Sequence, residues 1–396
     1  MKNVRGTVPT LTLLVTLVGF PQISESIFTP ILPALQQTLH VSANRVQLTM
    51  SVYFIAFALG VLIWGQLADR WGRRPALLAG IVIYLIGNVG LLLSQTLTGI
   101  IISRLVQAFG ASTGSVVTQT IMRESFHGRA GAKIFAQTSA ALALAPALGP
   151  LIGGAIQTWA GERNVFVALV ILAILVFGYA ALALPETRPQ SITAETDAQQ
   201  DLLHLLWRDP VVWAYGILIG GINGMLFSYY AEAPFIFETH FHFRAVTYGA
   251  LGLSLALASL LGSLLVNWLL TWWQPQQLII GGLSLSCLAS AGLWLAAINN
   301  QPGWLVIGFF LAFLGFNVTL PNALNRALVG YEAVMGRASG WFSLGYYCLV
   351  SALTYGMSVL HGHSIQTLPK FFLGTAIVML TVFGLVDQRH RHKATS

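Results

Sequence analysis

The chain carries very little charge. Only 8% of its 396 residues are Asp, Glu, Lys or Arg, whereas a soluble domain usually has about 25%. Because this number of charges is too small to cover a surface that faces water, most of the outer surface is expected to face lipid. In lipid the backbone must satisfy its own hydrogen bonds, which leaves α-helices or a closed barrel. The apolar runs are long and do not alternate with polar residues, so they predict helices.

Cysteine and enzyme signatures are also scarce. The two cysteines, Cys287 and Cys348, lie in apolar runs and fit neither a disulfide framework nor a metal site. The segment His361-Gly362-His363 offers two ligands, too few for a metal site. The chain has no GxxxxGK[ST] and no HExxH sequence, so ATP as an energy source, a cofactor and an enzymatic activity are not expected. The net charge of +7 is spread over short loops, which favours a role in membrane topology over nucleic-acid binding.

Twelve apolar runs are long enough to span a bilayer. They cover residues 9–36, 44–67, 75–95, 98–122, 131–158, 163–185, 210–236, 245–269, 276–298, 302–326, 337–359 and 369–387. The one long polar stretch, 186–209, separates residues 1–185 from 210–396, with six spans on each side. We therefore predict an all-α integral membrane protein with twelve transmembrane helices, arranged as two pseudo-symmetric six-helix bundles joined by a linker.

The basic residues predict the orientation. With both termini inside, 15 of the 20 Lys and Arg residues fall in inner segments and 4 in outer ones; Arg104 lies within a span. Loops that stay in the cytoplasm carry the excess of positive charge. Both termini and the linker 186–209 are therefore expected on the cytoplasmic side.

The loop between the second and third spans has a specific pattern. Residues 65–75 read GQLADRWGRRP, with two glycines that permit a tight turn and an acid among three arginines. This segment resembles the signature loop of the major facilitator superfamily. The resemblance implies that the loop gates the cytoplasmic side by latching the two halves, and a basic loop that only sets topology is the alternative. The gating residues it implies are Gly65, Asp69, Arg70, Gly72, Arg73 and Arg74. The equivalent loop 267–277 has lost the glycines and the charges, so the latch is expected in one half only.

Arg104 lies inside the fourth span. A charge in a spanning helix costs roughly 2.5 kcal/mol or more, so it is expected to face the interior of the protein. The segment RLVQAFG from Arg104 to Gly110 resembles the fourth-helix motif of the same family, with Ala108 where the family prefers Gly. The resemblance implies a part in proton-coupled gating. The alternative is that Arg104 reaches to the outer surface.

A proline- and glycine-rich segment interrupts the fifth span. Residues 145–154 read APALGPLIGG, and such a composition predicts a kinked helix that its neighbours approach closely. The segment resembles the motif of the antiporter branches of the superfamily, with Ala145 in place of the first Gly, and it favours export. The alternative is a kink that serves helix packing and does not indicate the direction of transport. The gating residues assigned here are Gly149, Pro150, Gly153 and Gly154.

Two acids are expected inside the membrane. Glu25 lies in the middle of the first span and Glu232 in the outer part of the seventh, the matching first helices of the two halves. A carboxyl group in a low-dielectric cavity can hold either a proton or a cationic substrate, so Glu25, Glu232 and Arg104 are the predicted proton-coupling residues. Alternatively, Glu25 is a structural hydrogen-bonding group and Glu232 is solvated at the rim. Side chains predicted to line a substrate cavity are Tyr53, Phe54, Gln107, Tyr229, Tyr230 and Asn317. The alternative for Asn317 is a bond to a neighbouring helix.

The end of the first span adds a finer resemblance. Residues 30–35, PILPAL, resemble a segment of the bicyclomycin and chloramphenicol resistance subfamily of drug:proton antiporters. That subfamily usually has Asp where this chain has Ser26, and the acid here is Glu25, about 100° around the helix. The resemblance implies a monomer in the bacterial inner membrane that exports amphiphilic small molecules in exchange for protons. The alternatives are a dedicated carrier, exporting or importing one metabolite or siderophore-like compound, and a membrane receptor built on a transporter scaffold.

Overall fold

The protein is all-helical throughout the part of the chain that the structure describes. The structure is a computed structural model that describes residues 9–126, 134, 137–138, 141–142, 144–188, 205–331, 335–362 and 364–395. The first half contains α1 (Leu11–Ser26), the 3₁₀ helix η1 (Thr29–Ile31), α2 (Leu32–Thr38), α3 (Ala43–Trp71), α4 (Arg73–Leu93), α5 (Leu97–Ser125), α7 (Ala145–Ala160) and α8 (Glu162–Ala183). The second half contains α10 (Pro210–Pro234), the π-helix η2 (Phe235–His240), α11 (Ala245–Leu269), α12 (Pro275–Ile298), α13 (Pro302–Arg326), α14 (Met335–Leu360) and α15 (Thr367–Thr395).

The predicted spans correspond closely to these helices. In the described ranges, eleven helical segments are long and apolar enough to cross a membrane, and each matches a predicted span. The remaining predicted span, 131–158, lies partly outside the described residues, and α7 forms its second part. The linker 186–209 is described only at its two ends, so its middle lies outside the described residues as well.

Two local features set helix boundaries. Gly72 separates α3 from α4 with a φ of 103°, a backbone conformation that residues other than glycine rarely adopt. Asp209, at the end of the linker, is the N-cap of α10, and its Oδ1 accepts hydrogen bonds from the backbone N–H groups of Val211 and Val212 at 2.9 and 3.3 Å. Such a cap satisfies donors that a helix N-terminus leaves free.

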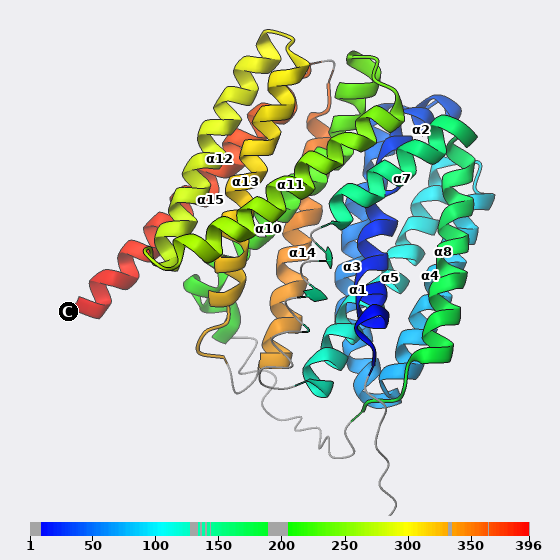
Figure 1. Ribbon diagram of the computed structural model, residues 1–396, viewed down its shortest axis with the longest axis horizontal. Coiled ribbons are helices and arrows are strands. Elements are labelled where there is room, and N and C mark those ends of the chain that lie inside the picture. Colours follow the sequence, from blue (N-terminus) through cyan, green and yellow to red (C-terminus); the bar gives the residue numbers. More distant parts are fainter. Residues whose placement is uncertain are drawn as a thin grey trace, which may run out of the picture.

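The helices form two groups that lie side by side. Figure 1 shows α1, α3, α4, α5, α7 and α8 on the right and α10 to α15 on the left. In the first group α5 packs against α1, α3 and α4, and in the second α13 packs against α10, α11 and α12. Each group therefore has its own set of helix contacts, as expected for a bundle.

The groups meet through two main helix pairs. α7 packs against α11 and α3 packs against α14, and in Figure 1 the upper part of the oblique α11 lies beside α7. In the order of the predicted spans these are the fifth with the eighth and the second with the eleventh. The fifth and eleventh spans hold the same position in their halves, and so do the second and eighth. The two pairs are therefore equivalent, as a two-fold repeat of six helices requires.

Two of the polar contacts between the groups lie on one side of the membrane. We call the side that holds the predicted linker the inner side, and the opposite side the outer side. The backbone N–H of Val246 on α11 donates to Thr158 on α7 at 3.1 Å, and the amide of Asn44 on α3 donates to the carbonyl of His361, just after α14, at 3.2 Å. Both contacts lie at outer helix ends, so the two groups are joined on the outer side.

Glycines on α4 and α5 bring these two helices into close contact. A Cβ at Gly110 of α5 would overlap the backbone of Tyr84 and Gly80 on α4. Because the backbone has no alternative position in a packed bundle, this contact requires glycine. In contrast, a Cβ at Gly178 of α8 has no neighbour within 4 Å.

We expect Gly110→Ala to destabilise the protein by about 1–3 kcal/mol, the usual cost of overpacking a core. The matched control Gly178→Ala should leave stability unchanged or raise it slightly, because alanine is the better helix former. Thermal unfolding followed by size-exclusion chromatography measures both variants. Equal loss of stability in the two would contradict the close contact between α4 and α5.

Candidate functional site

Glu25 lies deep in the membrane on α1. It is fourteen residues from the start of the helix at Leu11, which places it about 21 Å along the axis in a hydrocarbon layer about 30 Å thick. The next residue, Ser26, faces α7: its hydroxyl donates to the carbonyl of Gln22 at 2.7 Å, and a Cβ at Gly149 of α7 would overlap it. Moving the acid from position 26 to position 25 therefore turns it from α7 towards a different set of helices.

The Glu25 side chain is buried among aromatic residues of both halves. The residue is 6% exposed, and its Oε1 has no hydrogen-bond partner in the described structure. The carboxylate lies within electrostatic reach of the hydroxyls of Tyr53 on α3, Tyr230 on α10 and Tyr347 on α14. A buried carboxylate oxygen without a donor is costly, so this position is prepared for a proton or for a ligand that carries a donor.

Further aromatic rings extend this surface across the boundary between the halves. The ring of Phe54 on α3 lies 4.2 Å from that of Phe227 on α10, and the ring of Phe57 lies 5.1 Å from that of Tyr347, centroid to centroid. Beside them the hydroxyl of Ser351 on α14 donates to the carbonyl of Ser51 on α3 at 2.7 Å. Tyr53, Phe54 and Tyr230 of the predicted cavity set therefore come together around Glu25.

Arg104 is fully buried and does not reach the outer surface. Its guanidinium lies between the rings of Phe28 and Tyr53, at 4.3 and 4.4 Å from their centroids. Its Nη1 donates to Oε1 of Gln107 at 2.8 Å, and its Nε donates to the carbonyl of Thr49 at 3.4 Å. The charge is thus held by aromatic faces and neutral acceptors. Arg104 is within electrostatic reach of Glu25 without forming a direct ion pair with it.

A polar chain inside the first bundle fixes Gln107. Its Nε2 donates to Oδ1 of Asn88 on α4 at 2.5 Å and to the hydroxyl of Ser24 on α1 at 3.3 Å. Oε1 of Gln107 accepts from Arg104, so both the oxygen and the nitrogen of its side-chain amide have hydrogen-bond partners. Gln107 therefore connects α1, α4 and α5 beneath Arg104, and Asn88 is a partner that the sequence analysis did not identify.

Glu232 is buried at the outer end of α10, although solvation at the rim was one expectation from the sequence. Its Oε2 accepts hydrogen bonds from Nε2 of Gln47 and pairs with Nδ1 of His361, both at 2.6 Å. Unlike Glu25, this acid has two side-chain partners. His361 was considered in the sequence only as a metal ligand, and Gln47 carried no signal, because contacts across 185 residues leave no local pattern.

The other two predicted cavity residues lie in the second bundle. The ring of Tyr229 packs edge-on against Phe309 and Phe313 of α13, at 4.9 and 5.6 Å between centroids. Asn317 lies where α13 contacts Gly262 of α11, and its amide donates to the carbonyl of Phe313 at 2.8 Å. Asn317 therefore serves helix packing here, which was one of its two expected roles.

The glycines of α7 lie at the contact with α1 and α11. A Cβ at Gly153 would overlap the backbone of Ile27 on α1, and one at Gly154 would overlap the carbonyl of Ala245 at the start of α11. From the other side, Gly249 of α11 lies against the carbonyl of Pro150. The proline- and glycine-rich segment thus forms the close crossing between the two halves.

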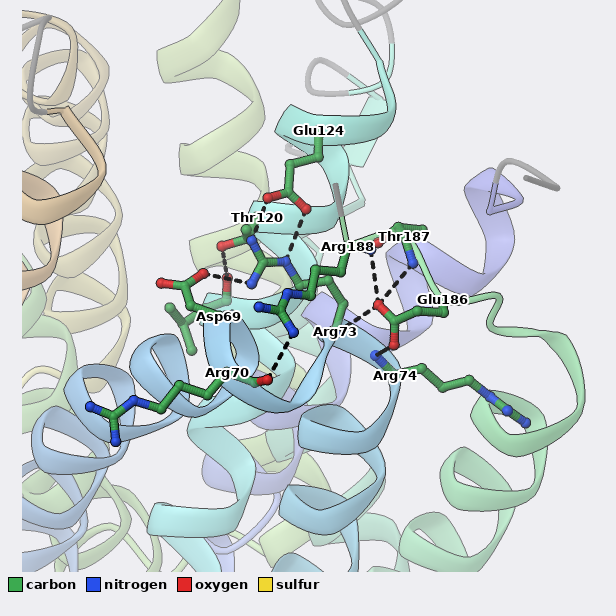
Figure 2. A network of polar contacts seen from close by, with 10 residues as sticks. Asp69, Arg70, Arg73, Arg74, Thr120, Glu124, Glu186, Thr187 and Arg188 are labelled. Atoms are coloured by element: carbon green, nitrogen blue, oxygen red, sulfur yellow. Dashed lines mark hydrogen bonds and ion pairs between the residues drawn. The ribbon is translucent and has the colours of Figure 1, made fainter. Parts of the chain in front are cut away.

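The signature loop forms a charge network on the inner side (Figure 2). The guanidinium of Arg73 is buried, with Nη1 at 2.6 Å from Oδ1 of Asp69 and Nε at 2.9 Å from Oε2 of Glu124 on α5. Its Nη2 pairs with the other oxygen of Glu124, so that contact is bidentate. Asp69 remains 56% exposed. Glu124 completes this network, and the sequence analysis did not identify it.

Glu186 attaches the beginning of the linker to the same loop. Its carboxylate accepts backbone N–H bonds from Arg73 and Arg74 at 2.9 and 3.2 Å, and from Thr187 and Arg188 at 3.0 and 2.9 Å. An acid at this place caps the N-terminus of α4 and interacts favourably with its dipole. A Cβ at Gly72 would overlap this carboxylate, so the glycine is required by space as well as by φ.

The three arginines of the loop have different roles. Among the described residues, Arg73 alone of the three forms ion pairs. Nη2 of Arg74 donates to the carbonyl of Ala181 on α8 at 2.8 Å, and the carbonyl of Arg70 accepts a hydrogen bond from Arg188 at the same distance. Gly65 has ordinary space around it. Within the described residues, all these partners belong to the first half or to the beginning of the linker. The network therefore does not bridge the two halves in this arrangement.

Catalytic and metal-binding arrangements receive no support from the geometry. Residues 110–114, GASTG, match the GxSxG spacing of hydrolases, but they lie inside α5 and the hydroxyl of Ser112 donates to the carbonyl of Phe109 at 2.8 Å. A hydrolase would place this serine on a sharp turn between a strand and a helix. The described residues contain no group of three or more His, Cys, Asp or Glu that would hold a metal.

We expect Arg104→Lys to destabilise the protein although it keeps the charge. A lysine cannot stack its planar group between Phe28 and Tyr53, and it leaves Oε1 of Gln107 without its donor at a cost of about 1–3 kcal/mol. The control Arg45→Lys changes an exposed arginine and should have no effect. Thermal unfolding of both variants checks this, and wild-type stability of Arg104→Lys would refute the stacked geometry.

Comparisons with known proteins agree with this architecture. A family model described as the Major Facilitator Superfamily matches residues 14–355. A transporter from Rickettsia bellii is 31% identical over 394 residues, covering 97% of this chain and 98% of that protein. A chloramphenicol resistance protein from Pseudomonas aeruginosa is 28% identical over 360 residues, covering 89% of this chain and 84% of that protein.

A solved structure confirms the fold. The structure of a D-xylose-proton symporter superposes with a TM-score of 0.78 at 16% sequence identity, covering 93% of this chain and 96% of that one. The resemblance seen in the signature loop is therefore confirmed over most of the chain. The chain belongs to the Major Facilitator Superfamily of membrane transporters, and it is not an enzyme.

Proposed function

We propose that this transporter exports amphiphilic small molecules in exchange for protons, and that Glu25 is the site at which the two compete. The observation that carries the proposal is the buried Oε1 of Glu25, which has no hydrogen-bond partner in the described structure although it lies among side chains of both halves. A bound proton removes the cost of that bare oxygen, and so does a bound cation. Either ligand stabilises the site, and each excludes the other.

Competition at one carboxyl group is sufficient for coupling. Substrate and proton must favour different states of the same site, because a ligand shifts an equilibrium only by its differential affinity for the states. Burial opposes ionisation of Glu25, and the charge of Arg104, held in a fixed position between two aromatic rings, partly offsets that cost. Arg104 therefore keeps Glu25 able to release its proton when a substrate arrives.

The aromatic surroundings favour a substrate with flat or cationic character. Tyr53, Phe54, Phe227, Tyr230 and Tyr347 offer ring faces and hydroxyls close to the acid. Aromatic faces attract cations and pack against planar groups. The name of the relative from Pseudomonas aeruginosa, a chloramphenicol resistance protein, supports a small antimicrobial compound as the cargo.

Alternating access gives the proposal its direction. We place the chain in the bacterial inner membrane with both termini in the cytoplasm, on the basis of its basic inner loops. The contacts that join the two halves on the outer side, together with the glycine crossing of α7 and α11, suit a rocking motion about the centre. Protons entering from outside would then drive the substrate outward.

We expect Glu25→Gln to abolish proton-driven transport while the protein still inserts and folds. Glutamine keeps the size of the side chain but can neither ionise nor attract a cation. Uptake of radiolabelled tetraphenylphosphonium into inverted proteoliposomes under a pH gradient measures the effect. Binding of this cation should weaken in acid for the wild type, since protons compete with it, and should not depend on pH in the variant.

The control for this experiment is Glu162→Gln, which removes an outer-surface carboxylate hydrogen-bonded to Thr38 at 2.9 Å. This variant should transport as the wild type does. Normal pH-driven transport by Glu25→Gln would disprove the role of Glu25.

We also expect expression of this chain in a drug-hypersensitive bacterium to raise the inhibitory concentrations of several unrelated amphiphiles, chloramphenicol among them. The wide aromatic surface and single acid favour such breadth over the recognition of one compound. Growth assays with a panel of drugs, with Glu25→Gln as the inactive control, check this. A panel without any shift would favour a dedicated metabolite carrier.

A further inference from the structure

We propose that Glu232 and His361 form a second proton-binding site, at the outer end of the molecule, and that a proton bound there holds the outer side closed. This inference deepens the proposed proton coupling, and it assigns to the pair a role separate from that of Glu25. The pair is defined by the 2.6 Å contact between Nδ1 of His361 and Oε2 of Glu232.

The geometry of this pair is that of a built site. The side chains of Glu232 and His361 are 3% and 15% exposed, so both are removed from bulk water. A second donor, Nε2 of Gln47, reaches the same oxygen of Glu232 at 2.6 Å. The His361 ring also packs edge-on against Phe235 of η2, 5.2 Å between centroids. Two donors meet on one carboxylate oxygen within an aromatic and apolar surround.

The pair lies across the boundary between the two halves. Glu232 lies near the end of α10 and His361 follows α14, whereas Gln47 belongs to α3 of the first half. Asn44, one turn before Gln47, donates to the His361 carbonyl at 3.2 Å. Opening of the outer side must separate α3 from α10 and α14, because these helices form the contact there. The separation breaks the bonds of Gln47 and Asn44 and exposes Glu232 and His361 to water.

Burial makes the closed form bind a proton more tightly than the open form. In the closed form a neutral histidine would leave the carboxylate of Glu232 as a buried net charge, which is costly. An imidazolium at His361 neutralises it through a charge-assisted hydrogen bond. In the open form water solvates both groups and their pairing is worth little. By linkage, proton binding favours the closed outer side, and loss of the proton as pH rises favours opening.

Other ionisable groups near this end have surroundings of their own. On α3, Arg45 is exposed, and α2 has no ionisable residue. On η2, Glu238 interacts electrostatically with Tyr248 of α11, and its buried Oε1 has no hydrogen-bond partner in the described structure. His240 is exposed and hydrogen-bonds to Asn300 at 3.1 Å. From α15, the amine of Lys370 lies 5.3 Å from the centre of the Trp294 ring. On α10, the nearest titratable residues are Tyr229 and Tyr230, three and two positions before Glu232. Tyr355 of α14 is exposed. His363 lies outside the described residues.

The sign of this effect agrees with proton-driven export. A proton taken from outside by the open form would close the outer side and so return the transporter to the inward-facing arrangement. Glu25 then handles the exchange with substrate, whereas the Glu232–His361 pair sets the equilibrium between outer-open and outer-closed forms.

The test measures the outer opening directly, without any substrate. Spin labels are placed at the exposed positions Gln95 and Gln301, on outer loops of opposite halves, in the full chain with Cys287→Ala and Cys348→Ala. Double electron–electron resonance in lipid nanodiscs gives the distance distribution. Lowering the pH from about 8 to about 5.5 should raise the ratio of short to long distances about tenfold, a usual size for coupling between two sites.

Three variants decide the outcome. His361→Gln and Glu232→Gln should each abolish the pH response, whereas His240→Gln, an exposed outer histidine, should retain it. The two substitutions test both partners of the pair independently. If gel filtration shows that one of these variants is misfolded, the other still gives the answer. An unchanged response in His361→Gln or Glu232→Gln, loss of the response in His240→Gln, or a wild type without any response would overturn the inference. Glu25→Gln should keep the response, so failure of the proposed transport function is distinguishable from failure of this site.

Discussion

A charged group inside hydrocarbon is costly unless the protein itself supplies its partners, and the interior of this transporter is organised around that cost. Among the described residues, three such groups lie deep in the membrane, and each has different partners. Arg104 is held between two aromatic rings and neutral acceptors, and Glu232 receives two donors on one oxygen. Glu25 keeps an oxygen without a partner in the described structure. The two satisfied groups stabilise one arrangement of helices, whereas the unsatisfied one leaves room for a ligand.

Much of the fold followed from residue order alone, because a spanning helix must be long and apolar whatever its neighbours are. The depth of Glu25 and Arg104, the turn at Gly72 and the close crossing of α7 have local causes, so local patterns revealed them. Partners brought together from distant segments did not: Gln47 reaches Glu232 across 185 positions. The sequence also did not predict how each helix is rotated about its axis. Asn317 therefore had two possible roles until the structure showed its contact with α11.

The two ends of the molecule are built on different principles. On the inner side, Arg73, Glu124 and Glu186 tie α3, α4, α5 and the linker into one body, entirely from partners of the first half among the described residues. On the outer side, the contacts run between halves, through glycine crossings and a few hydrogen bonds. Ion pairs thus hold the inner helix ends of one half together, whereas helix packing and single hydrogen bonds join the halves on the outer side.

One helix takes part in every one of these regions. α3 extends over 29 residues without an internal proline, about 43 Å at the usual rise. It carries Gln47 near its outer end, Tyr53 and Phe54 at the centre, and Asp69 at its inner end. A stiff rod of this kind acts as a lever: a small tilt that frees Gln47 must also displace the two rings beside Glu25 and swing Asp69. Events on opposite faces of the membrane can therefore be timed against each other mechanically, through a single uninterrupted element.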